Sequence, residues 1–111
     1  MTTIITGAAG FIGNALAASF PPDDDVILVD RKPIAAAHGH RTIICDLSDP
    51  QAVDALPSAD TVYHLSAYNN TAHFYSKPLS VIHDTLSPTM HLITRYAKEA
   101  RFVYSSSSEI Y

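Results

Sequence analysis

Three glycines, Gly7, Gly10 and Gly13, lie between an apolar run and a helical pattern near the start of the chain. A strand that turns at glycines and restarts as a helix can bind phosphate, because the first helical N–H groups are unpaired and carry the positive end of the helix dipole. Gly7 would permit the tight turn, Gly10 would leave the backbone open to a pyrophosphate, and Gly13 would let the helix lie close to its strand. The pattern predicts a phosphate-binding turn. The alternative is an ordinary strand–helix connection.

Asp30 ends the next apolar run. It lies close to the roughly 20-residue offset at which an acidic side chain meets the adenosine ribose of a bound dinucleotide. Arg31 could instead contact a 2′-phosphate, but the Asp30 carboxylate would repel that phosphate, so the pair favours NAD over NADP. Outside this role, Asp30 could be a helix cap or an exposed turn residue.

Asp46 ends a third apolar run, where a cofactor contact and a helix N-terminal cap are both open interpretations. Either Ser48 or Asp49 could cap the short helix that begins near Pro50. The histidines and the single cysteine lack the spacing of a ligand set, so no metal site is predicted. We expect His64, at the end of an apolar run, to be a hydrogen-bonded core residue.

The elements that would position these side chains alternate along the chain. Short β-branched or apolar runs predict strands, and longer periodic segments predict helices. Alternation of this kind, with right-handed crossovers, gives an α/β fold with a doubly wound parallel sheet and helices on both faces. The polar candidates then lie at the carboxyl ends of the strands, along one edge. We expect strands at residues 2–6, 26–29, 42–45, 61–65 and 101–105, and helices at 11–20, 50–56 and 78–100.

Composition narrows the function classes. The 111 residues are 47% hydrophobic and 16% charged, which is typical of a globular domain. A net charge of −4 argues against nucleic acid and anionic membranes as partners. No apolar run approaches the roughly 20 residues of a membrane span, and no signal peptide is visible. The single Cys45 excludes an internal disulfide, so we expect a cytoplasmic protein.

Several motifs together resemble one family, the NAD-dependent nucleotide-sugar epimerases and dehydratases, or extended short-chain dehydrogenases/reductases. They occur in the order and spacing of that family along essentially the whole chain. The resemblance implies a Rossmann-type fold with bound NAD. The motifs are Thr6-Gly7-x-x-Gly10-Phe11-Ile12-Gly13, Asp30, Asp46-Leu47, His64-Leu65-Ser66-Ala67, Lys77-Pro78 and Val103-Tyr104-Ser105-Ser106-Ser107.

The resemblance assigns expected cofactor contacts residue by residue. Backbone atoms of the glycine turn would bind the pyrophosphate, and Asp30 would accept both ribose hydroxyls. Residues after the third strand would flank the adenine, and residues after the fourth would run beside the nicotinamide. The turn contacts are Gly10, Phe11 and Ile12, the adenine contacts are Asp46 and Leu47, and the nicotinamide contacts are Leu65, Ser66 and Ala67.

The resemblance also assigns catalytic positions. Ser107 aligns with the Ser/Thr that hydrogen-bonds the reacting sugar hydroxyl, and Ser108 and Glu109 align with a pair found in members that eliminate water or carbon dioxide. The family base, a Tyr in a Tyr-x-x-x-Lys motif, is absent, because the sequence ends at Tyr111. We therefore expect residues 1–111 to be the N-terminal NAD-binding part, lacking the C-terminal strands and the substrate domain and inactive alone.

The predicted long helix departs from the family pattern. Asn-x-x-Gly-Thr falls on residues 85–89, where Thr85 replaces Asn, Pro88 replaces Gly, and Thr89 is retained. A proline inside a helix removes an amide hydrogen bond, so Pro88 is expected to kink or break this helix.

Three functional interpretations follow. The chain could be the cofactor-binding part of a nucleotide-sugar epimerase, dehydratase or decarboxylase, a non-catalytic dinucleotide-binding module, or a structural subunit. The predicted fifth strand would leave an open edge and uncovered apolar surface, so we expect self-association into a homo-oligomer. A nucleotide-sugar is the expected partner of the complete enzyme.

Overall fold

The computed structural model describes residues 1–66 and 76–105. All five strands form one parallel sheet with the order β3-β2-β1-β4-β5. The predicted α/β fold with a Rossmann-type, doubly wound sheet is confirmed. The strands are β1 (Thr2–Thr6), β2 (Asp25–Asp30), β3 (Arg41–Ile44), β4 (Thr61–His64) and β5 (Arg101–Tyr104).

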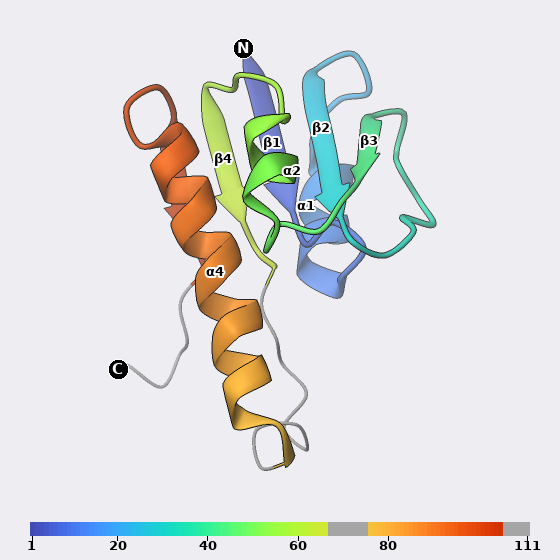
Figure 1. The fold of residues 1–111 in the computed structure, drawn as a ribbon. Helices are drawn as coiled ribbons and strands as arrows, with labels where there is room; N and C mark the ends of the chain where they lie inside the picture. Colours follow the sequence, from blue (N-terminus) through green and yellow to red (C-terminus); the bar gives the residue numbers. More distant parts are fainter. Residues whose placement is uncertain (67–75, 106–111) are drawn as a thin grey trace, which may run out of the picture.

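The strand order reverses beside β1 (Figure 1). From β1 the chain moves outward through β2 to β3, and then crosses to the other side of β1 to add β4 and β5. The carboxyl ends of β1 and β4 lie side by side at this reversal. Such a reversal is the place where open α/β sheets bind ligands.

Helices cover both faces of the sheet (Figure 1). On one face, α1 (Phe11–Ser19) buries Ala17 against Ile5 and Leu28. On the other face, Ile4 and Ile27 pack with side chains from α2 (Pro50–Asp54) and α4 (Pro78–Tyr96). Because successive strand residues point to opposite faces, the apolar runs at residues 4–5 of β1 and 26–29 of β2 supply both cores.

The start of α2 resolves one open choice. Asp49 is the N-cap, and its side chain accepts a 3.0 Å hydrogen bond from the Gln51 N–H. Pro50 occupies the first turn, where a missing N–H carries no penalty. The helix ends at Asp54, slightly before the predicted end.

The predicted break at Pro88 is wrong, because α4 continues through this residue. A proline removes one intrahelical hydrogen bond, but the helix on its far side is held by packing. Leu92 and Tyr96 are fully buried in the core. Tertiary burial of this kind overrides local helix propensity. The helix ends at Tyr96 rather than at the predicted residue 100.

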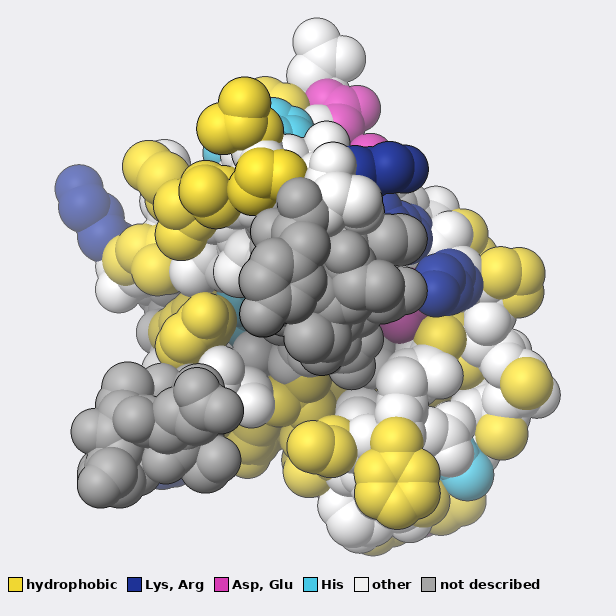
Figure 2. Space-filling model, turned by 90° about the horizontal axis from the view of Figure 1, so that it is seen from below, with side chains coloured by type: hydrophobic (Ala, Val, Ile, Leu, Met, Phe, Trp, Pro, Cys, Tyr) yellow, Lys and Arg dark blue, Asp and Glu magenta, His cyan; other side chains and the backbone are white. Residues whose placement is uncertain are grey.

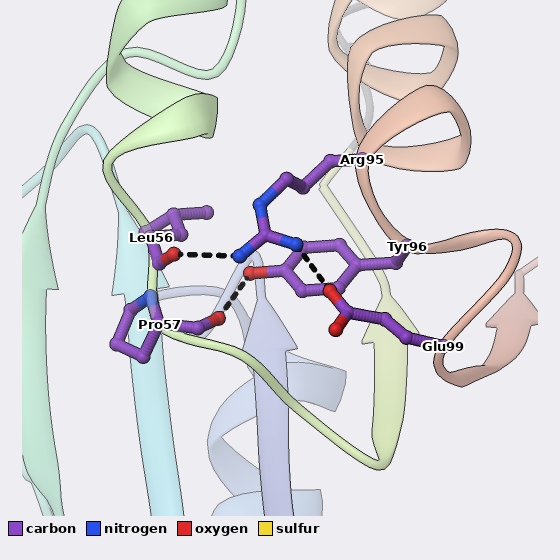
Figure 3. Close-up of polar contacts among 5 residues, drawn as sticks. All are labelled: Leu56, Pro57, Arg95, Tyr96 and Glu99. Carbon is purple, nitrogen blue, oxygen red and sulfur yellow. Dashed lines mark hydrogen bonds and ion pairs between the residues drawn. The ribbon is translucent and has the colours of Figure 1, made fainter.

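The C-terminal end of α4 is fastened to the segment between α2 and β4 (Figure 3). The Tyr96 hydroxyl donates to the Pro57 carbonyl at 2.6 Å, and Arg95 donates to the Leu56 carbonyl at 3.2 Å. Arg95 also pairs with Glu99, and its guanidinium lies 4.7 Å from the centre of the Tyr96 ring. Burial raises the pKa of Tyr96 to about 12. We call this group of contacts the Tyr96 anchor.

The outward face of α4 is apolar. Large exposed side chains recur every three or four residues, so they share one stripe along the helix. In the view of Figure 2, hydrophobic side chains gather at the upper left, on the α4 side. No helix in the described ranges has both the length and the apolarity needed to cross a bilayer. The α4 stripe consists of Leu79, Ile82, Leu86, Met90 and Ile93.

Candidate functional site

A cleft of about 440 Å³ lies at the carboxyl edge of the sheet, where the strand order reverses. The ends of β1, β2, β3 and β4 and the middle of α4 form its walls. The cleft brings together residues that are far apart in the sequence. Its lining comprises Gly7, Ala9, Gly10, Phe11, Ile12, Gly13, Asp30, Arg31, Lys32, Cys45, Asp46, Leu47, Ser48, Leu65, Ser66, Asp84 and Pro88.

The glycine turn is built by close backbone approach. Gly7 has φ +69°, and a Cβ there would lie 2.8 Å from the backbone of Leu65 and Ser66. A Cβ on Gly13 would lie 2.2 Å from the Gly7 carbonyl oxygen, well inside contact distance. The tight turn predicted at Gly7 and the close helix approach predicted at Gly13 are confirmed. The phosphate contact itself stays a prediction.

The N-terminus of α1 fits an anion. Gly10 is the N-cap and makes no side-chain hydrogen bond, and the first turn carries no acidic residue. The leading N–H groups of the helix are therefore left for a ligand or water. Phe11 and Ile12 line the cleft, and their side chains are 92% and 64% exposed. This arrangement suits a pyrophosphate.

Asp30 joins two turns at the mouth of the cleft. One carboxylate oxygen accepts from the Ala9 N–H and the other from the Lys32 N–H, both at 2.9 Å. A carboxylate oxygen has two lone-pair sites, so each retains capacity for a ligand hydroxyl. Arg31 lines the same cleft, and neither Arg31 nor Lys32 forms an ion pair within the described ranges.

Asp46 begins a turn rather than a helix. Its Oδ1 accepts from the Ser48 N–H at 3.0 Å and from the Ser48 hydroxyl at 2.7 Å. These hydrogen bonds lower the pKa of Asp46. The capping role belongs to Asp49, so the interpretation of Asp46 as the helix cap is wrong. Leu47 is buried and also contributes to the cleft wall.

A buried polar cluster lies behind the cleft, at the end of β4. His64 is only 1% exposed, and its Nδ1 lies 2.7 Å from the Thr6 hydroxyl. Its Nε2 lies 2.8 Å from the Thr89 hydroxyl on α4. Burial lowers the pKa of His64 to about 4, so the ring is neutral at pH 7. The prediction of a hydrogen-bonded core histidine is confirmed.

Sequence reasoning missed the contribution of α4 to this cleft. Asp84 and Pro88 line it from positions four residues apart, which share one helix face. Their spacing was visible, but only the docking of α4 decides which face turns inward. The other additions, Ala9, Lys32, Cys45 and Ser48, are neighbours of predicted residues. Burial, with the nearby carboxylates, raises the pKa of Cys45.

Four predicted site residues lie outside the described residues. They are Ala67, Ser107, Ser108 and Glu109. The remaining cofactor candidates, from Gly7 to Ser66, all line the cleft. Their proximity is therefore a structural finding, and their roles toward a cofactor remain predictions.

The chain is similar in sequence and in structure to known proteins that are named for, or were solved with, UDP-glucuronic acid. UDP-glucuronic acid decarboxylase 4 of Arabidopsis thaliana is 26% identical over all of this chain, which spans 27% of the relative. The structure of MoeE5 in complex with UDP-glucuronic acid and NAD is 29% identical, with a TM-score of 0.84. This chain is covered completely in that match and corresponds to 38% of the MoeE5 chain.

A further solved structure has the same fold. Uronate dehydrogenase from Agrobacterium tumefaciens, complexed with NAD, is 25% identical with a TM-score of 0.77. The match covers 96% of this chain and 40% of the dehydrogenase. The sequence therefore spans well under half the length of these relatives. A family match extends over residues 3–111, and the chain belongs to the NAD dependent epimerase/dehydratase family.

Proposed function

We propose that residues 1–111 are the N-terminal NAD-binding part of a nucleotide-sugar epimerase, dehydratase or decarboxylase. The observation that carries this proposal is the cleft at the sheet reversal, which combines an uncapped helix N-terminus with the Asp30 carboxylate. The helix N-terminus would hold the pyrophosphate through Gly10, Phe11 and Ile12. Asp46 and Leu47 would flank the adenine, and Leu65 and Ser66 would border the nicotinamide.

The preference for NAD over NADP would come from charge at the ribose. Asp30 would accept the two ribose hydroxyls and repel a 2′-phosphate. Arg31 and Lys32, which line the same cleft, would set how strong this preference is. The solved structures of MoeE5 and of uronate dehydrogenase in complex with NAD support the choice of cofactor.

The chemistry of the complete enzyme would be a transient oxidation of a sugar hydroxyl. NAD, when bound, would accept the hydride and return it. Ser107 would hydrogen-bond the reacting hydroxyl, and Ser108 with Glu109 favours elimination or decarboxylation. The decarboxylase relative and the UDP-glucuronic acid complex of MoeE5 support a nucleotide-sugar as substrate. A base of the Tyr-x-x-x-Lys type is not in these residues, so this chain alone would be inactive.

Calorimetric titration of the chain with NAD and NADP tests the cofactor proposal. We expect NAD to bind more tightly than NADP, and Asp30→Asn to weaken NAD binding roughly tenfold and to narrow the difference between the two cofactors. Asp60→Asn is the matched control. Asp60 also accepts from a backbone N–H, that of Thr2 at 2.7 Å, but does not line the cleft. No binding of either cofactor at millimolar concentration would instead favour a structural subunit.

We also propose that the chain self-associates through the α4 stripe. Five large exposed apolar side chains share one helix face, and apolar surface gathered in one patch commonly marks a protein–protein contact. A second copy that presents the same stripe would bury it by two-fold symmetry. A monodisperse monomer at high concentration in light scattering would contradict this.

A further inference from the structure

His64 connects three elements that form the cofactor cleft. Its ring lies between Thr6 at the end of β1 and Thr89 on α4, while its own backbone ends β4. The ring is buried, and it lies against the Phe102 and Tyr104 rings of β5, with centroid distances of 6.0 and 5.8 Å. No charged side chain in the described ranges bonds to it.

The direction of each hydrogen bond follows from counting protons. The Thr89 hydroxyl donates its single proton to the Thr85 carbonyl at 3.0 Å, so it must accept from His64 Nε2–H. A neutral imidazole has one N–H, so Nδ1 is an acceptor. The Thr6 oxygen accepts from the N–H groups of Leu65 and Ser66, which fill its two lone-pair sites, so it cannot also accept from Nδ1. Its own proton goes to Nδ1 at 2.7 Å, which is nearer than the Ser66 hydroxyl at 3.3 Å. The Ser66 hydroxyl lies 3.4 Å from the same ring nitrogen.

Thr6 then has only acceptor sites left, and the next loop fills them. The N–H groups of Leu65 and Ser66 lie 3.1 and 3.3 Å from the Thr6 oxygen and donate to it. The same two residues form the backbone against which Gly7 is packed. One uninterrupted chain of donors thus runs from the loop after β4, through Thr6 and His64, to α4.

We propose that His64 is a positioning residue for the cofactor cleft. Held as the Nε2–H tautomer, it ties the glycine turn and the loop after β4 to the stretch of α4 that supplies Asp84 and Pro88. The consequence for NAD affinity rests on the proposed function. The order of the hydrogen bonds does not.

Thr89 offers the cleanest test, because its substitution leaves the ring in place. Thr89→Val removes the hydroxyl with little change of shape, and Thr89→Ser keeps it. Nitrogen-15 NMR of the wild-type ring should show a pyrrole-like Nε2 and a pyridine-like Nδ1. In Thr89→Val we expect amide exchange of Leu65 and Ser66 to be roughly three- to tenfold faster, as the loss of one hydrogen bond predicts. Thr89→Ser should stay within about twofold of wild type.

NAD titration supplies the second readout. Thr89→Val should weaken NAD binding by the same roughly three- to tenfold, and Thr89→Ser should restore it. Tyr96→Phe is the control, since it removes a partly buried hydrogen bond from the same helix at the far edge of the sheet. An Nδ1–H tautomer, or unchanged amide exchange in Thr89→Val, would overturn the inference. If the wild-type chain does not bind NAD, the proposed function is overturned instead. The ring tautomer and the amide exchange of Leu65 and Ser66 would still decide the role of His64.

Discussion

The helix α4 is attached to the sheet at two places that differ in kind. At the amino edge, Tyr96 donates to the Pro57 carbonyl, and the chain of contacts ends there. At the carboxyl edge, Thr89 meets His64, which passes the contact on to Thr6. Both rings are almost completely buried.

The difference lies in the number of polar atoms on each ring. The Tyr96 hydroxyl makes one hydrogen bond within the described residues, to the Pro57 carbonyl, so it fastens α4 to one segment. An imidazole has a donor on one side and an acceptor on the other, so His64 can relate two elements to each other. The first arrangement holds α4 to a neighbouring segment, and the second links elements that line the cleft.

The largest loss of stability is expected from Gly13→Ala, which disturbs the packing of α1 at the carboxyl edge of the sheet. The new Cβ would lie 2.2 Å from the Gly7 carbonyl oxygen, so α1 must move away from the turn. We expect a loss of at least about 3 kcal/mol of unfolding free energy in chemical denaturation.

Gly10→Ala is the matched variant for that experiment. Its Cβ would meet the Gly7 carbonyl oxygen at 3.3 Å, which a small shift can relieve. Stability should fall by less than about 1 kcal/mol, while NAD binding weakens. Equal losses of stability in the two variants would contradict the packing argument for Gly13.

The contacts of His64 and the Tyr96 anchor should weaken at opposite ends of the pH scale. For His64, the unfolded chain takes up its proton near the ordinary pKa of 6.5, but the folded chain only near 4. Its contribution to stability is therefore complete above pH 6.5 and is lost as the pH falls toward 4, by roughly 3 kcal/mol. For Tyr96 the pKa is raised from 10 to about 12, so stability is complete below pH 10 and is lost as the pH rises toward 12.

Denaturation curves across pH separate these two effects from the rest of the molecule. His64→Gln should flatten the acid limb relative to wild type, and Tyr96→Phe should flatten the alkaline limb. The other carboxylates and phenols titrate in each variant and in wild type alike, so their effects cancel when the two stability curves are subtracted. If the acid limb of His64→Gln is as steep as that of wild type, the pKa of His64 is not lowered by folding.

Tyr96→Phe should lower stability by about 1–2 kcal/mol at pH 7, because it leaves the Pro57 carbonyl without its buried donor. NAD affinity should not change, since no atom of the Tyr96 anchor lines the cleft. Parallel denaturation and NAD titration check both statements. A change in NAD affinity comparable to that of Thr89→Val would remove the distinction between the Tyr96 anchor and the His64 contacts.

The smallest effect on stability is expected on the outward face of α4. Leu86 is 53% exposed in the middle of the α4 stripe. Leu86→Glu should therefore change the unfolding free energy of the single chain by less than about 0.5 kcal/mol. It should also shift an oligomer toward monomer in analytical ultracentrifugation. Lys98→Glu, at an exposed position off the stripe, is the control and should leave the association unchanged.

Local patterns were sufficient wherever neighbours along the chain decide the structure. The strand that ends at Thr6, the turn at Gly7 and the apolar run of β2 were all predictable, because glycine freedom and short buried runs act over a few residues. The position of Asp30 beside the turn followed from the parallel order of the strands.

The sequence by itself therefore determined the sheet, the glycine turn and most of the cleft lining. Only the tertiary structure decided that α4 runs through Pro88, that Asp84 faces the cleft, and that His64 bonds Thr6 and Thr89. The physical reason is the distance along the sequence over which each interaction acts. Propensity and turn chemistry are local, whereas a helix docked on a sheet gains enough from burying residues such as Leu92 to override one proline. The docking of α4 on the sheet also determines which of its side chains contact those of the strands.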